Sequence, residues 1–192
     1  LWETPANWDV NDSTWTWPNE EVIAMSATDP DVNIRNVNLD TIAIDILTGG
    51  AVSRIGEVAI QGAADGSTTG VLTIDNASSL SVEGRLAIGG RDGAAGQIDI
   101  LGGSTVTITG EGSDLYVSDN NGSVGTLNIV DSTVDIVDIL AVDQGEGYIN
   151  ISGDSTITAN RIDIANSASA VGYLDISGNT IVNLTDDFKV DE

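Results

Sequence analysis

From residue 31 onward the chain is built of short runs in which apolar and polar residues alternate. Residues 97–118 hold three such runs, whose aliphatic residues lie two positions apart: Ile98 and Ile100, Val106 and Ile108, Leu115 and Val117. Successive side chains of a β-strand point to opposite faces, so the two members of each pair point the same way. Gly, Ser, Asp and Asn fill the breaks between runs, and these residues favour turns. The pattern predicts three short strands joined by tight corners.

The same three-strand unit recurs, with clear repeats starting near residues 43, 70, 96, 125, 147 and 172. Self-similarity at this period is typical of solenoids. Helical repeats are excluded because no apolar stripe of period 3.6 appears and β-branched residues dominate. We therefore predict an all-β fold, a parallel β-helix with about three short strands per coil and about six to seven coils. In the looser unit after residue 51, Arg54 falls at an inward position, so either a bulge re-aims it or Ile55 takes its place.

Residues 1–31 differ from the solenoid expected over residues 32–192. All four tryptophans lie there, together with the three prolines: Trp2, Trp8, Trp15 and Trp17, and Pro5, Pro18 and Pro30. The alternation is weak until Val22–Met25, so we expect an irregular cap with at most one strand. The first coil of a β-helix must be covered, and the tryptophans are suited to that role. They are also suited to stacking on carbohydrate or to docking on another subunit.

Composition and charge exclude several function classes. The chain has 30 acidic and 6 basic residues, a formal net charge of −24, which disfavours nucleic acid and anionic membranes as partners. It has no Cys and no His, which removes disulfides, thiolate metal sites and Ser/His/Asp catalysis. No apolar run reaches the roughly 20 residues that span a bilayer. Because the chain begins at Leu1 rather than Met, we expect either a secreted protein whose signal peptide has been removed or a fragment.

The repeats from residue 70 to 192 resemble the β-solenoid repeats of bacterial secreted and surface proteins, namely autotransporter passengers and related adhesin-like proteins. The shared phrase is G-x-L-x-I-x-x-x-S-x-V-x-I followed by x-L-x-V-G, which appears here as GVLTIDNASSLSVEGRLAIGG and GQIDILGGSTVTITGEGSDLYVS. The Trp-rich opening LWETPANWDVNDSTWTWPNEEV is also typical of such proteins. The resemblance implies secretion to the cell surface or exterior and a structural or adhesive role.

Acidic and amide residues recur in the loops that follow the third strand of successive units. The candidates for a metal site are Asp92, Asp119, Asn120, Asn121, Asp143 and Glu146. Ca²⁺ prefers such oxygen ligands, so the stacked loops are a candidate calcium site. The alternative is that Gly, Asn and Asp serve only as turn formers. No cofactor is required by anything else in the sequence.

Catalysis is a third interpretation. A lyase acting on an acidic polysaccharide would need clustered carboxylates and a basic residue, and Arg85 and Arg161 are the candidates for that residue. Both open third strands and face outward by alternation, where a surface ion pair is the simpler expectation. We therefore expect no enzyme activity.

A flat hydroxyl face for ice binding is weakly indicated, because the threonines fall on different strands. These are Thr73, Thr105, Thr107, Thr109, Thr126, Thr133 and Thr156.

The end of the chain suggests a function. Residues 186–192 form a third strand with no capping helix or polar tail after it. Either the chain is cut from a longer solenoid, or the open end pairs with the N-terminal region of another copy and builds a filament. The principal hypothesis is an extracellular, non-enzymatic structural protein that assembles head to tail into a filament or surface layer. The tryptophans would meet Phe188 and Val190 at the joint. The alternative is an adhesin or carbohydrate-binding module that recognises surface glycans.

Overall fold

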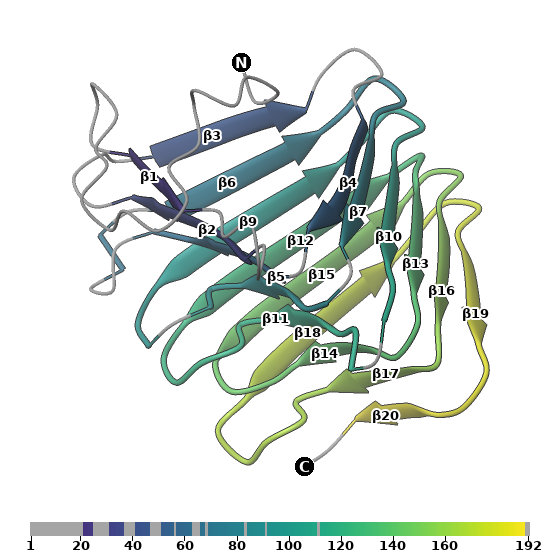
Figure 1. Cartoon of the computed structure of the whole chain (residues 1–192). Coiled ribbons are helices and arrows are strands. Elements are labelled where there is room, and N and C mark those ends of the chain that lie inside the picture. The colour runs from purple at the N-terminus through teal and green to yellow at the C-terminus, as the bar shows by residue number, and fades with distance from the viewer. Residues whose placement is uncertain are drawn as a thin grey trace.

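The chain forms an all-β solenoid in a computed structural model (Figure 1). The structure describes residues 21–24, 31–36, 41–46, 51–55, 57–62, 66–67, 69–82, 84–90, 92–110 and 112–190, and the side chains of these ranges from residue 59 onward. The four tryptophans of the expected cap lie outside the described residues.

Three sheets run along the solenoid. Sheet B contains β3 (Thr41–Ile46), β6 (Thr69–Ile74), β9 (Ala95–Ile100), β12 (Val124–Val130), β15 (Glu146–Ser152) and β18 (Val171–Ile176). Sheet C contains β4 (Ala51–Ile55), β7 (Ser79–Val82), β10 (Thr105–Ile108), β13 (Thr133–Ile136), β16 (Thr156–Ala159) and β19 (Ile181–Leu184). Sheet A contains β1 (Glu21–Ala24), β2 (Asp31–Asn36), β5 (Glu57–Gln61), β8 (Leu86–Ile88), β11 (Leu115–Val117), β14 (Ile139–Val142), β17 (Arg161–Ile164) and β20 (Phe188–Val190).

The chain visits sheets B, C and A in turn, and each strand pairs in parallel with its counterpart one coil away. Six strand triplets result, from β3–β4–β5 to β18–β19–β20, which confirms the predicted three strands per coil. Figure 1 shows β3 at one end of the stack and β18, β19 and β20 at the other. The solenoid therefore has two distinct ends and three long side faces.

The core consists of ladders of aliphatic side chains, one residue per coil. In sheet B, for example, Leu72, Ile98, Leu127 and Ile149 stand in register, and all four are buried. The inward pairs expected from the alternation are buried in every coil from β6 to β17. Burying such a side chain stabilises the fold by about 1.5–3 kcal/mol, so the ladders supply most of the favourable free energy.

Two further ladders set the corners. Buried serines occupy the corner between sheets B and C: the Ser104 and Ser132 amides donate to the Oγ atoms of Ser132 and Ser155, at 3.2 and 3.3 Å. The inward glycines that begin the repeats stack at the start of the sheet B strands, in register from Gly70 to Gly172. Short residues at these positions let the chain turn tightly around the core.

The N-terminal units contain two irregularities. The register between β4 and β7 shifts after Val52, so that Ile55 pairs with Val82. Ile55, and not Arg54, therefore holds the ladder position, as one of the two alternatives predicted. The strand expected near Val22–Met25 is β1, but it runs antiparallel to β2 at the edge of sheet A. This reversed strand breaks the parallel stacking of that sheet.

Candidate functional site

The carboxylates of the predicted calcium site lie at one corner of successive coils, where sheet A leads into sheet B. Asp119 is buried and pairs with Arg85, with 3.2 Å between Arg85 Nη1 and Asp119 Oδ2. Asp143 accepts hydrogen bonds from the amides of Gln144 and Asn166, at 3.1 and 2.8 Å. The Tyr148 hydroxyl donates to Glu146. Asp119, Asp143 and Glu146 therefore already have protein partners.

Of the three remaining candidates, Asn120 donates from Nδ2 to Asp119 Oδ2 at 3.2 Å, and Asp92 and Asn121 are exposed on the same corner. The described residues contain no group of three or more Asp or Glu side chains placed to hold a metal ion. The stacking thus brings the predicted residues to one side of the rod without gathering their carboxylates into one cluster. Calcium binding stays a prediction.

Both candidate basic residues lie on the outer side of sheet A. Arg85 precedes β8, and its guanidinium carbon lies 5.9 Å from the centre of the Tyr116 ring. Arg161 opens β17, and its Nε lies 2.9 Å from Oδ2 of Asp163, whose side chain is 2% exposed. A buried carboxylate beside an arginine is the expected way to offset the cost of burying a charge. Each arginine therefore has a buried carboxylate as an ion-pair partner.

Tyr116 sits among three carboxylates on this face. Its hydroxyl donates to Oδ2 of Asp114 at 2.9 Å. Burial raises the pKa of the Tyr116 phenol well above its ordinary value, and the hydrogen bond and the negative charges of Asp114, Asp143 and Asp119 act in the same direction. The phenol is consequently held in its neutral form, in which it serves as a hydrogen-bond donor.

The C-terminal coil carries apolar residues that continue the core ladders without a coil beyond them among the described residues. These are Leu174 and Ile176 in β18, Val182 and Leu184 in β19, and Phe188 and Val190 in β20. Ile176, Phe188 and Val190 are 45%, 51% and 64% exposed, although their partners one coil earlier are buried. We call these six residues the end face. The predicted assembly residues Phe188 and Val190 belong to it.

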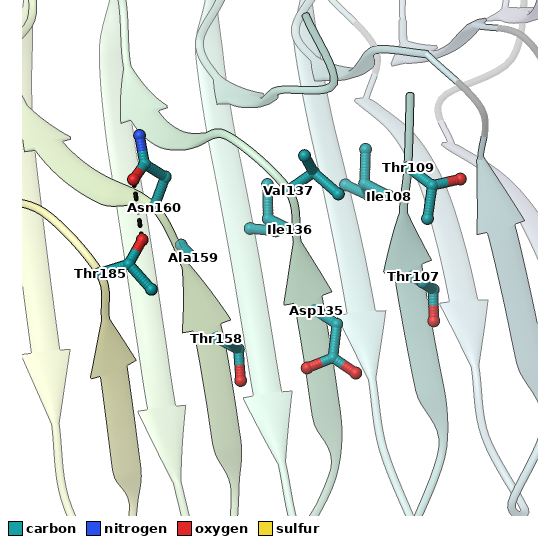
Figure 2. Close-up of a pocket in the computed structure, with 10 residues that line it drawn as sticks. All are labelled: Thr107, Ile108, Thr109, Asp135, Ile136, Val137, Thr158, Ala159, Asn160 and Thr185. Atoms are coloured by element: carbon teal, nitrogen blue, oxygen red, sulfur yellow. Dashed lines mark hydrogen bonds between the residues drawn. The ribbon is translucent and has the colours of Figure 1, made fainter. Parts of the chain in front are cut away.

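A groove on the outer side of sheet C was not foreseen from the sequence. It has a volume of about 350 Å³ and follows four successive coils (Figure 2), with ten lining residues: Thr107, Ile108, Thr109, Asp135, Ile136, Val137, Thr158, Ala159, Asn160 and Thr185. Thr107, Asp135 and Thr158 occupy one row across β10, β13 and β16. Their outward positions between buried pairs were visible in the repeats, but that they flank a hollow was not.

The threonines also form rows. Ser79, Thr105, Thr133 and Thr156 stand in register on sheet C, and so do Ser81, Thr107, Asp135 and Thr158. These threonines do fall on different strands, but parallel stacking aligns Thr105, Thr133 and Thr156 in one row of sheet C, which the sequence alone did not indicate. Thr73 and Thr126 lie on sheet B instead.

A smaller hollow of about 260 Å³ lies where sheet A leads into sheet B, lined by residues that include Val124, Glu146 and Val171. Nearby on sheet B, Tyr148 and Tyr173 stack with their ring centres 4.8 Å apart and their planes at 8°. The hydrogen bond to Glu146 raises the pKa of Tyr148. The stacked rings therefore connect two neighbouring coils on the outer surface of sheet B.

Comparisons with known proteins do not assign a family or a function to the chain. Within the described residues there is no helix of the length and apolarity needed to cross a membrane. The chain matches no protein-family model, no curated protein and no solved structure.

Proposed function

We propose that the chain is a non-enzymatic structural protein that assembles head to tail, through the ends of its solenoid, into an extracellular filament or surface layer. The observation that carries this proposal is the end face. Six residues at core-ladder positions are left partly or largely exposed, in register with ladders that are buried from β6 to β17. A contiguous apolar surface of this kind is typical of an interaction site.

The backbone supports the same contact. Strands β18, β19 and β20 are the outermost strands of their sheets among the described residues, so each has an edge with free amide and carbonyl groups. At the opposite end, β3 and β4 are the outermost strands of sheets B and C in the described part of the chain. Pairing β18 of one copy with β3 of the next, and β19 with β4, would continue the parallel sense used inside the rod. It requires β1 and β2 to leave sheet A, because β2 occupies the position beside β5 that β20 would take. A head-to-tail contact that does not close into a ring generates a filament.

Sheet A would behave differently at the joint. Among the described strands, the outermost one of this sheet at the N-terminal end is β1, which runs antiparallel to β2. If β1 and β2 keep their places, β20 of one copy would meet the reversed strand β1 of the next, and sheets B and C, which end two strands earlier, would stay apart at the joint. Parallel continuation of sheets B and C through the joint therefore depends on displacement of β1 and β2 from the N-terminal end of sheet A.

The test is electron microscopy and sedimentation velocity of the full chain, compared with the variants Ile176→Asp and Phe188→Asp. The unaltered chain is expected to form uniform fibres, whose axial repeat is at least roughly 29 Å, six coil spacings of ~4.8 Å. Either Asp substitution would place a charge in the joint and leave single rods. Because Ile176 and Phe188 are half-exposed, both variants are expected to keep the β-sheet circular dichroism of the parent.

Val137→Asp is the matched control, because Val137 is an exposed valine on the side of the rod and not at its end. This variant should assemble like the parent. Single rods of the parent at every concentration and salt condition would contradict the proposal. Fibres that form equally well from all three variants would also contradict it, because the contact would then lie elsewhere.

A further inference from the structure

The groove on sheet C combines exposed apolar groups with polar groups that have no protein partner. The Thr107 and Thr158 hydroxyls, the Asp135 carboxylate and Nδ2 of Asn160 all line it, and none of them is engaged in a hydrogen bond or ion pair among the described residues. The Asn160 side chain is held in place through its other atom, because the Thr185 hydroxyl donates to Asn160 Oδ1 at 2.8 Å (Figure 2). The amide hydrogens of Asn160 therefore remain available.

Other outward rows of the solenoid use their polar groups internally. On sheet B, Asp99 accepts hydrogen bonds from Gln97 and from Asn128, the latter at 2.7 Å, and the Asn150 amide donates to Asn128 at 2.8 Å. Such chains of bonded amides and carboxylates stabilise the stacking. Apart from the bond between Thr185 and Asn160, the polar side chains of the sheet C groove show no such pairing within the described part of the chain, so their donors and acceptors are free to bind a ligand.

The free groups recur with the period of the coils. Thr107, Asp135 and Thr158 lie on neighbouring strands in register, and Thr109, Val137, Asn160 and Thr185 line the groove beside them, at and just beyond the strand ends (Figure 2). Strands are spaced by ~4.8 Å, so the four coils extend the groove over roughly 14 Å along the rod axis. An extended polymer whose units advance by a similar distance would meet equivalent groups at each unit.

The chemistry of the lining selects among polymers. Hydroxyls, an amide and one carboxylate suit a ligand rich in hydroxyl groups, and Val137, which is 57% exposed, offers an apolar surface to C–H groups. The formal net charge of −24 and the carboxylate of Asp135 repel polyanions such as uronate polymers and nucleic acids. Neutral sugars satisfy both conditions.

We propose that the sheet C groove binds a straight, neutral, β-1,4-linked polysaccharide chain, which lies along the solenoid axis and spans about three sugar units. Asp135 accepts hydrogen bonds from sugar hydroxyls, Thr107 and Thr158 exchange hydrogen bonds with them, and Asn160 donates to a ring or linkage oxygen. Val137 and the threonine methyl groups pack against the C–H faces of the sugars. The groove lies on the side of the rod, so this activity does not depend on assembly at its ends.

Ordered water is the competing occupant of this face, because rows of hydroxyls on a flat sheet also suit an ice surface. Two observations favour sugar. The row formed by Ser81, Thr107, Asp135 and Thr158 is interrupted by a carboxylate, and the surface beside it is hollowed and not flat. A charged group in a concave site suits a ligand whose hydroxyls reach into the groove.

The test is isothermal titration calorimetry of the full chain with cellohexaose and chitohexaose. Maltohexaose, which is curved, and hexagalacturonate, which is charged, serve as comparison ligands. We expect binding of at least one of the first two ligands and little or none of the comparison pair. Affinity should rise from the disaccharide to the trisaccharide and change little beyond it, since the groove spans about three units.

Variants locate the site. Asp135→Ala is expected to weaken binding about tenfold, and Thr158→Val about threefold, because each removes a hydrogen bond to the ligand. Thr133→Val is the matched control: Thr133 lies on the same strand as Asp135, faces outward and does not line the groove. It should bind like the parent, and all three variants should retain the parent's thermal unfolding midpoint within a few degrees.

Absence of binding to both β-1,4-linked hexasaccharides would overturn the proposal. Equal binding of hexagalacturonate would do so as well, because the charge argument would then be wrong. Thermal hysteresis measurements test the alternative that this face binds ice. If the chain shapes ice crystals, binds no sugar and loses the ice activity in Thr107→Leu, the rows on sheet C bind ordered water and not a polysaccharide.

Discussion

The inward glycines at the start of the sheet B strands leave no space for a side chain. A Cβ atom built on Gly125 would lie 2.4 Å from the amide nitrogen of Ser118, and one on Gly96 would lie 2.2 Å from the carbonyl oxygen of Ile60. Both neighbouring atoms belong to the backbone and cannot move aside without shifting a strand. The glycines that mark the repeats in the sequence are therefore required by close approach of the chain at the corner between sheets A and B.

Gly125→Ala is expected to destabilise the solenoid by about 3 kcal/mol, because the added methyl group overpacks a backbone contact. Urea unfolding followed by circular dichroism measures this change. Thr126→Ala, at the next position and facing outward, is the control and should cost less than about 1 kcal/mol. Similar unfolding midpoints for the two variants would mean that the corner relaxes and that the glycine is not needed for space.

The raised pKa of Tyr116 predicts how the free energy of unfolding changes at alkaline pH. Its folded-state pKa is raised, by burial first and then by its acidic neighbours, above the value of about 10 that it has when unfolded. The contribution of the neutral Tyr116 phenol to the free energy of unfolding is thus complete below pH 10. It is lost as the pH rises further, because this phenol ionises in the unfolded chain before it ionises in the folded one. Tyr116→Phe should therefore lose less stability than the parent between pH 10 and pH 11. Unfolding free energies measured across this range test the sign. A steeper decline in the variant would refute the assignment.

At the scale of the elements, every strand from β6 to β17 contributes the same kind of inward pair, but its surroundings depend on its place in the stack. Ile129 in β12 has a coil on either side and is fully buried. Ile176 in β18 holds the equivalent ladder position and is 45% exposed. Equal residues at equal positions of the repeat therefore differ in what they contribute to stability.

Ile129→Ala should cost about 2–5 kcal/mol, because it leaves a cavity between two coils. Ile176→Ala should cost less than half as much when measured on single rods at low protein concentration. Under conditions that favour assembly, the same substitution should additionally weaken the joint and raise the concentration at which fibres form. A cost for Ile176→Ala in dilute rods equal to that of Ile129→Ala would show that the end face is covered within one copy.

The whole molecule is a strongly acidic rod. A formal net charge of −24 makes two copies repel each other, and the apolar end face must overcome this repulsion for assembly to occur. Salt shortens the range of that repulsion, from about 30 Å at 0.01 M to about 8 Å at 0.15 M ionic strength. Whether the apolar attraction between end faces outweighs the charge repulsion between copies thus depends on the ionic strength of the medium.

Raising NaCl from about 0.01 to 0.15 M should lower the concentration at which fibres form, because the Debye length then falls from about 30 Å to about 8 Å and the repulsion between copies is screened. Light scattering at a series of protein concentrations measures this change. CaCl₂ at matched ionic strength is the control. An equal effect of the two salts indicates screening alone, whereas a much larger effect of calcium would indicate binding at the corner carboxylates. Fibres that are insensitive to both salts would contradict a charge-limited joint.

The repeat pattern by itself determined the solenoid, its three strands per coil and the inward ladders. This was possible because strand alternation and corner residues are local properties, and a repeated local pattern stacks in only one register that buries every aliphatic pair. The glycine at the start of each unit was visible for the same reason, although its role in close packing was not.

Only the tertiary structure decided which outward residues share a face and what they meet there. Thr107, Asp135 and Thr158 are separated by more than twenty residues at each step, and they form one row because coils of unequal length still stack in register. Asp119 appeared in the sequence as a loop ligand, yet it is buried against Arg85 from the preceding coil. The reversal of β1 likewise depends on its pairing with β2 and not on its own pattern. Contacts between coils set these features, and the sequence of a single repeat does not specify which residues of the neighbouring coils it will contact.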